Sequence, residues 1–241
     1  MRPPRQFALP LEIPPSFARA DFLADPSNAE ALAWLDRPGD WPNRRLLIWG
    51  AEGVGKTHLL HATAAREGWR VLDGAALRGP PTPGPAAVDD ADCVIDERAL
   101  LHLANLCVER GETLLLTARE PPSRWALQLP DLASRMRATL AVEITLPGEA
   151  LLRALLAKLL ADRQLRLMPE TRDWLLRRLP REPAGLLEAV ARIDEAGLAA
   201  RQGITRALIR AALAGWDGFG PLDDSGETNP DDGSPPRFGL L

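Results

Sequence analysis

Residues 46–62 read Leu-Leu-Ile-Trp-Gly-Ala-Glu-Gly-Val-Gly-Lys-Thr-His-Leu-Leu-His-Ala, and this stretch decides how the rest of the chain is interpreted. Residues 50–57 carry the pattern Gly-x-x-x-x-Gly-Lys-Thr, which is typical of phosphate-binding loops. The apolar run before the pattern predicts a buried strand, and the residues from His58 onward predict a helix. The pattern therefore has the strand–loop–helix context that a phosphate-binding loop requires.

The residue types of this loop explain how it would hold a nucleoside phosphate. Glycines let the backbone curl until several N–H groups point at one phosphate, and the helix N-terminus adds partial positive charge. Lys56 is predicted to reach the β- and γ-phosphates, and Thr57 to place its hydroxyl on Mg²⁺. The alternative is a glycine turn with an incidental lysine. The predicted nucleotide-binding residues are Gly50, Gly53, Val54, Gly55, Lys56, Thr57 and His58.

An acidic segment further along the chain is the candidate second half of the site. Residues 92–97 read Asp-Cys-Val-Ile-Asp-Glu, which predicts an apolar strand that ends in two carboxylates. Asp96 is predicted to lie near Mg²⁺, and Glu97 is predicted to polarise the attacking water. Because acidic residues also end many strands without a catalytic role, this interpretation depends on the phosphate-binding loop upstream.

Apolar segments alternate with helical patterns up to residue 146, and the pattern is helical from residue 147 onward. Such alternation predicts an α/β fold, a parallel five-stranded sheet with helices on both faces, followed by a small all-α lid. The predicted strands are 46–49, 69–72, 92–97, 113–117 and 140–146. The predicted helices include 29–35, 99–110 and four in the lid, over 149–163, 169–179, 184–200 and 205–214.

Four parts of the chain differ in composition. Residues 1–15 contain spaced prolines, which favour an extended arm over a helix. Residues 16–147 form the predicted nucleotide-binding domain, and residues 148–216 the predicted lid. Residues 217–241 are rich in Gly, Pro and Asp and are predicted to be disordered.

Composition narrows the classes of function. The formal net charge of −4 disfavours binding to duplex DNA as the main role. The chain has no apolar run of membrane-spanning length and no charged-then-apolar leader, so we expect a soluble, cytoplasmic protein. Cys93 and Cys107 lack metal-ligand spacing and suggest no disulfide framework.

The phosphate loop, the acidic strand end, the Ala-Ser-Arg at 133–135 and the helical lid together resemble the AAA+ family. Residues 53–62 and Leu-Thr-Ala-Arg-Glu-Pro-Pro at 116–122 are similar to the nucleotide-binding part of the bacterial initiator DnaA. Within this group the chain most resembles Hda, the DnaA-related regulatory inactivators that lack the initiator's DNA-reading domain. Three stretches carry that resemblance: Gln-Phe-Ala-Leu-Pro-Leu (6–11), residues 47–56 and Leu-Pro-Asp-Leu-Ala-Ser-Arg (129–135).

The resemblance implies a regulator of replication initiation that binds ADP or ATP with Mg²⁺, docks on the DNA polymerase sliding clamp and meets ATP-bound DnaA. Arg135 stands at the position of an arginine finger, which would stimulate hydrolysis in DnaA in trans. The alternatives for Arg135 are a surface arginine or one held in an intramolecular salt bridge. No sequence-specific DNA contact and no membrane contact are implied, and a homo-oligomer is compatible. The implied clamp-binding residues are Gln6, Phe7, Leu9, Pro10 and Leu11.

Two positions depart from the family pattern. Arg119 stands where the family usually has an aspartate after the fourth strand, and Ala184 stands where DnaA-like lids place an arginine. Loss of the lid arginine implies poor self-hydrolysis, so the chain is expected to activate hydrolysis in a partner more than to turn over ATP itself. Two alternatives stay open: a self-acting ATPase of the helicase-loader or transposition-helper type, and an AAA+ scaffold without turnover.

Overall fold

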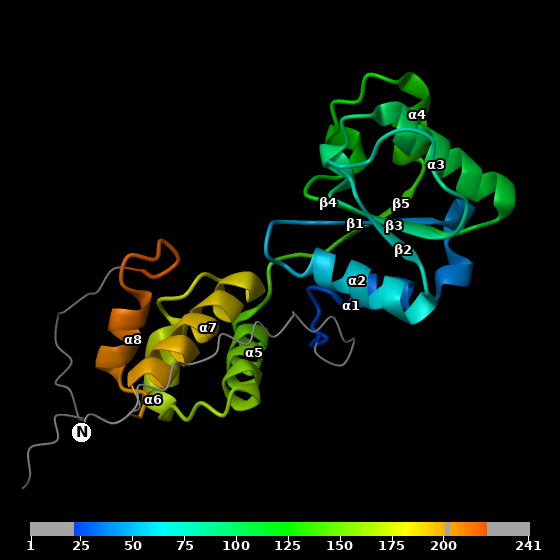
Figure 1. The fold of residues 1–241 in the computed structure, drawn as a ribbon. Helices are drawn as coiled ribbons and strands as arrows, with labels where there is room; N and C mark the ends of the chain where they lie inside the picture. The colour runs from blue at the N-terminus through cyan, green and yellow to red at the C-terminus, as the bar shows by residue number, and fades with distance from the viewer. Residues whose placement is uncertain (1–21, 201–202, 221–241) are drawn as a thin grey trace, which may run out of the picture. The chain divides into compact units, whose positions relative to one another are not determined.

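The computed structural model describes residues 22–200 and 203–220 (Figure 1). The predicted arm and most of the predicted tail lie outside these residues. The chain divides into two compact units, one that reaches to Leu155 and includes Arg181–Ala184, and one with Leu156–Pro180 and the residues from Gly185 onward.

A five-stranded sheet forms the centre of the first unit, as the sequence predicts. Its strands lie in the order β2-β3-β4-β1-β5, and neighbouring strands are parallel. β1 therefore lies between β4 and β5, where the order of the strands changes direction, and ligands of open α/β sheets bind at the carboxyl ends of strands at such a point. The bounds are β1 Arg45–Trp49, β2 Arg70–Asp73, β3 Ala86–Asp89, β4 Leu114–Ala118 and β5 Leu140–Glu143.

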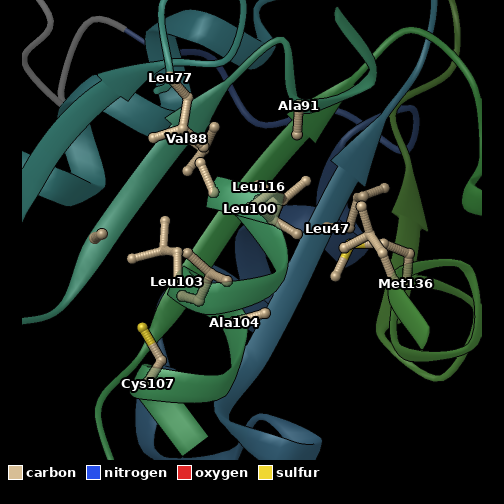
Figure 2. Packing of buried hydrophobic residues seen from close by; sticks show 14 of the residues in the cluster. Leu47, Leu77, Val88, Ala91, Leu100, Leu103, Ala104, Cys107, Leu116 and Met136 are labelled. Atoms are coloured by element: carbon tan, nitrogen blue, oxygen red, sulfur yellow. The ribbon is translucent and has the colours of Figure 1, made fainter. Parts of the chain in front are cut away.

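Helices cover both faces of this sheet because the strands are apolar on both sides. Leu46 and Ile48 of β1 pack in one cluster with residues of α1 (Ala29–Leu35) and α2 (Lys56–Glu67). Leu47 packs on the opposite face with residues of α3 (Glu97–Arg110) and α4 (Pro130–Arg137), as Figure 2 shows. Short 3-10 helices occupy Pro38–Asp40, Pro42–Arg44, Ala91–Cys93 and Pro122–Arg124.

The third strand is not where the sequence analysis placed it. The strand predicted over residues 92–97 is wrong, because β3 is Ala86–Asp89 and the predicted segment forms a 3-10 turn and the start of α3. Ala86, Ala87 and Val88 have no exposed surface, whereas the side chain of Ile95 is 74% exposed. Small alanines give a weak hydropathy signal, yet in a central strand their burial is complete, and this explains the error.

The lid contains four helices in the described residues, as predicted, and no described helix is long and apolar enough to cross a membrane. Trp174 lies at the centre of the second unit and is fully buried, with Phe219 against the edge of its ring at 5.9 Å between centroids. The Thr205 hydroxyl accepts a hydrogen bond from Leu208 N–H and so caps the last helix. The helices are α5 Glu149–Asp162, α6 Pro169–Leu176, α7 Pro183–Ala200 and α8 Arg206–Leu213.

Candidate functional site

The loop between β1 and α2 has the backbone that a phosphate cradle needs. Gly50, Gly53 and Gly55 have φ angles of 153°, 80° and 102°, which L side chains rarely adopt. A Cβ atom on Gly50 would also lie 2.3 Å from the carbonyl oxygen of Ile144. Gly55 is the N-cap of α2, so the loop ends at a helix N-terminus.

Lys56 lies inside this loop and is only 6% exposed. Its Nζ donates to the carbonyl oxygens of Gly50 at 2.9 Å and Ala51 at 2.8 Å. Burial lowers the pKa of Lys56, while the charges of Asp90 and Asp89 oppose this shift. The ammonium group is thus held at the place where a phosphate-binding lysine is required.

Asp89, the last residue of β3, lies at the same carboxyl edge of the sheet as the loop. The Thr57 hydroxyl donates to Oδ1 of Asp89 at 3.2 Å, and the hydroxyl of Thr117, a fully buried residue of β4, donates to the same oxygen. Asp90 N–H donates to the Thr117 hydroxyl at 3.0 Å. Hydroxyl and carboxylate oxygens are the ligands that Mg²⁺ prefers, so Thr57 and Asp89 fit a magnesium ion beside bound phosphates.

Asp90, which follows directly, is half-buried in the same acidic group. Burial raises the pKa of Asp90, and the neighbouring Asp89 and Asp92 raise it further, while Arg119 and Lys56 lower it. A carboxylate with a raised pKa beside a phosphate cradle is a candidate for proton transfer or for orienting water. Asp89 and Asp90 were missed in the sequence analysis, although the run Ala86-Ala87-Val88 before them is the signal that could have found them.

Asp96 and Glu97, the predicted carboxylates, contact other parts of the chain. Asp96 caps α3 by accepting from Ala99 N–H at 3.2 Å, and it also accepts from Gly79 N–H at 3.1 Å. The bonds from Gly79 and Ala99 lower the pKa of Asp96. Glu97 accepts from the N–H groups of Gln128 at 2.8 Å and Leu129 at 2.7 Å. The acidic pair that the structure brings to the loop is therefore Asp89 and Asp90, which corrects the prediction for Asp96 and Glu97.

The remaining predicted loop residues have different surroundings. Val54 is 3% exposed and packs in the cluster with α1 and α2, so its side chain anchors the loop to the core. The His58 ring lies 5.6 Å from the ring of Phe22, centroid to centroid. Phe22 also lies against Gly55, where an added Cβ would be 2.8 Å from its Cε2 atom. Phe22 is thus a further residue at the loop that the sequence analysis did not select.

Arg119 follows β4 at the same edge of the sheet. Its Nη1 lies 3.1 Å from Oε2 of Glu52 in the loop, and its backbone N–H donates to Asp92 at 2.8 Å. The side chains of Arg119 and Glu52 are 55% and 76% exposed, so the ion pair adds little to stability. An arginine directly after β4 therefore lies beside the loop.

Arg135 lies apart from these groups. It is in the last turn of α4, and its guanidinium makes no hydrogen bond or ion pair with another residue of the part that the structure describes. The chain leaves α4 and enters β5 at Leu140, which pairs with Leu46 near the start of β1. The end of α4 is therefore at the amino edge of the sheet, whereas the loop follows the carboxyl end of β1. Roughly 13 Å of strand separates the two edges.

Two other kinds of site were considered: a metal site built from side chains alone, and the predicted clamp-binding segment. No group of three or more His, Cys, Asp or Glu residues suited to a metal ion occurs among the described residues. The five predicted clamp-binding residues, Gln6, Phe7, Leu9, Pro10 and Leu11, lie outside the residues that the structure describes.

The geometry can be compared with solved structures of the same fold. Domain III of the replication initiator DnaA from Thermotoga maritima superimposes with a TM-score of 0.72 at 19% identity, covering 86% of this chain and 99% of that one. DnaA from Aquifex aeolicus bound to AMPPCP has a TM-score of 0.62 at 21% identity, covering 81% and 69%. A single-residue variant of RuvB from Thermotoga maritima has a TM-score of 0.63 at 13% identity, covering 82% and 71%.

These similarities and the parallel sheet with its phosphate loop and helical lid define the class: the chain has the AAA+ fold. Residues 150–213 match the family model of the Hda lid domain. This part of the chain is therefore similar to the Hda lid domain.

Proposed function

We propose that this protein is a DnaA-related regulator of replication that binds adenine nucleotide and stimulates ATP hydrolysis by DnaA. The observation that carries the proposal is the Hda lid match over residues 150–213 on a chain with the fold of DnaA domain III. The structure of Aquifex aeolicus DnaA with AMPPCP supports an adenine nucleotide as the ligand of the equivalent loop here.

Each part of the loop has a defined task in this proposal. Backbone N–H groups of the glycine loop and the N-terminus of α2 bind phosphate oxygens, and Lys56 exchanges its two carbonyl partners for the β- and γ-phosphates. Thr57 and Asp89 would hold Mg²⁺, which would supply positive charge to offset that of the phosphates. Asp90 orients water, and Arg119 releases Glu52 to meet the phosphate group.

The position of Arg135 supports action on a partner. Since its guanidinium lies toward the amino edge of the sheet, it is too far from its own loop to contact a phosphate there. Its planar group can share two hydrogen bonds with phosphate oxygens as negative charge develops on them. Arg135 therefore acts as an arginine finger for the nucleotide bound to DnaA.

The N-terminal arm is the proposed attachment to the sliding clamp. Pro10 keeps Leu9 in extended geometry, and alternate side chains of an extended segment point the same way, so Leu9 and Leu11 enter one apolar groove. Gln6 fixes the register through its amide group, and Phe7 adds apolar area.

Reconstitution tests the proposal. Purified protein is mixed with DnaA loaded with labelled ATP, with and without clamp loaded on DNA, and conversion to ADP is measured. We expect fast conversion only when protein and clamp are both present, and loss of the clamp effect when residues 1–12 are deleted, with Tm within about a degree of the native value because the arm precedes the core. Conversion at the rate of DnaA alone would refute the proposal.

A self-acting ATPase of the loader or helper type is the second candidate, and the Thr57–Asp89–Asp90 group favours it, because these are the groups that hydrolysis in cis requires. Turnover by the isolated protein distinguishes the two. A rate without DnaA that equals the rate with DnaA supports the second candidate.

A further inference from the structure

Arg45, the first residue of β1, is an unusual buried arginine. It is 3% exposed, and its Nε and Nη1 atoms have no hydrogen-bond partner in the described part of the chain. Arginine is rarely buried without a partner, because a desolvated charge is costly unless an anion or an acceptor satisfies it. An unsatisfied guanidinium inside a core therefore needs an explanation.

The direction of the Arg45 side chain follows from the strand. Successive side chains of a strand alternate between the two faces, so Arg45 lies on the face of Leu47, which α3 and α4 cover. The like charge that acts on it comes from one of these helices, at Arg135 of α4. Burial, and then the like charge of Arg135, lower the pKa of Arg45. No carboxylate forms an ion pair with either arginine within the described residues.

From this geometry we infer that Arg45 and Arg135 form one oxyanion site at the amino edge of the sheet, between the ends of α3 and α4. The guanidinium group of Arg135 offers N–H donors in a planar array, and the two positive charges together suit a phosphate with several charged oxygens. Arg45 is held rigidly by burial, whereas Arg135 is half-exposed and can move to meet the ligand.

The ligand is a terminal phosphate that a partner molecule presents. This step rests on the proposed function, because Arg135 is its arginine finger. Arg45 is a positioning residue in this scheme: its charge repels the guanidinium of Arg135 toward solvent, and the incoming phosphate, bound by Arg135, then lies in the field of both positive charges. Low local dielectric makes the attraction between the buried Arg45 charge and the phosphate stronger than that of an equally distant charge at the surface.

Inorganic phosphate is the direct probe, and it is used in a Lys56→Ala background so that the phosphate loop does not contribute. We expect phosphate to raise the Tm of this protein at constant ionic strength, and acetate to have no such effect. Arg45→Met should abolish the shift, Arg45→Lys should keep part of it, and the matched control Arg44→Met, which changes an exposed neighbour, should keep all of it. An equal loss with Arg44→Met, or a full shift with Arg45→Met, overturns the site. A shift with acetate that equals the phosphate shift overturns phosphate as the ligand.

A second measurement separates this inference from the proposed function. With Lys56 restored, Arg45→Met should lower stimulation of DnaA about ten- to a hundredfold, the range of one charge-assisted hydrogen bond, while Tm without phosphate stays equal or rises. A fall in Tm that accounts for the lost stimulation would show a structural role and overturn the positioning role. If Arg135→Ala stimulates DnaA normally but the phosphate shift still depends on Arg45, the arginine-finger proposal fails and the oxyanion site stands.

Discussion

The two edges of the sheet differ in how their charges are satisfied. At the carboxyl edge, Lys56 is bound by two carbonyl oxygens and Arg119 is paired with Glu52. At the amino edge, the guanidinium groups of Arg45 and Arg135 have no such partners among the described residues. At the carboxyl edge the chain's own acceptors hold the cations when no nucleotide is bound, whereas we propose that the cations of the amino edge are complementary to an anion from a partner.

Helix dipoles explain why two cations are tolerated at the amino edge. In a parallel sheet with crossover helices, the helix C-termini lie at the edge where the strands begin, and they carry partial negative charge. α3 ends at Arg110 and α4 ends at Arg137, both next to the start of β1 or β5. Their carbonyl groups offset part of the cost of Arg45 and Arg135, yet they leave hydrogen-bonding capacity free for a ligand.

The largest effect is expected at the amino edge. Arg135→Ala should leave folding and nucleotide affinity unchanged, because the side chain lies far from its own loop. It should lower stimulation of DnaA hydrolysis by roughly 10³–10⁵-fold, the range that arginine fingers contribute elsewhere. Single-turnover hydrolysis by DnaA measures this loss.

Arg137→Ala is the matched control, since Arg137 lies in the same last turn of α4 and is exposed. It should keep most of the stimulation. If the two variants exchanged these results, Arg137 would be the arginine finger. Arg45 would then have no role in stimulation through Arg135.

The carboxyl edge gives the next largest effect. Lys56→Ala removes a charge-assisted contact to phosphate, worth roughly 1.5–3 kcal/mol, so ADP should bind about ten- to a hundredfold more weakly by calorimetry. Lys158→Ala in the lid removes the same charge elsewhere and should leave ADP affinity as it is. Native affinity in the Lys56 variant would mean that the loop does not hold the nucleotide.

Some parts of the fold could be predicted from the sequence, and the strand β3 could not. The loop from Gly50 to Thr57, the parallel sheet and the lid were predictable, because glycine spacing and hydrophobic periodicity are local signals. β3 was not, because Ala86 and Ala87 are weakly hydrophobic and a run of exposed or half-buried apolar residues, Val94-Ile95, stood nearby. That one error moved the acidic pair from Asp89 and Asp90 to Asp96 and Glu97.

The environment of Arg45 could not be predicted from the sequence for a different reason. A single arginine at the start of a strand gives no sign of whether it will point to solvent or into the core. Its electrostatic environment includes Arg135 in the last turn of α4, which is far away in the sequence. Contacts of this kind are set by the topology of the sheet and not by a local pattern.

The correction to the acidic pair gives a further prediction. Asp89→Asn should remove the Mg²⁺ dependence of nucleotide affinity, because an amide is a much weaker ligand for a hard cation. Asp96→Asn should leave that dependence intact and change stability little, since an asparagine caps a helix nearly as well as an aspartate. Titrations of ADP with and without Mg²⁺ compare the two variants. Loss of Mg²⁺ dependence in the Asp96 variant alone would restore the first interpretation.

The smallest effect is expected for the substitution Asp90→Asn. The way in which the resulting change in Tm depends on pH identifies its cause. Burial and the neighbouring carboxylates raise the pKa of Asp90 in the folded protein, so the folded state binds the proton more tightly than the unfolded state does. The negative charge of Asp90 therefore lowers the free energy of unfolding. This destabilisation is absent below the pKa of Asp90 in the unfolded chain, about 3.9, and complete above its pKa in the folded protein.

Asp90→Asn removes this cost, so it should raise the Tm of the nucleotide-free protein at pH 7. For a chain of this size about 1 kcal/mol corresponds to roughly 2–4 °C, and we expect a rise of that order or less. Asparagine also tolerates the left-handed backbone of this residue, with φ of 49°, and that benefit does not change with pH. The charge contribution is thus the part of the rise in Tm that disappears when the scans are repeated near pH 3.5. A rise in Tm that is equal at both pH values would assign the whole effect to the backbone. The charge of Asp90 would then not destabilise the folded protein.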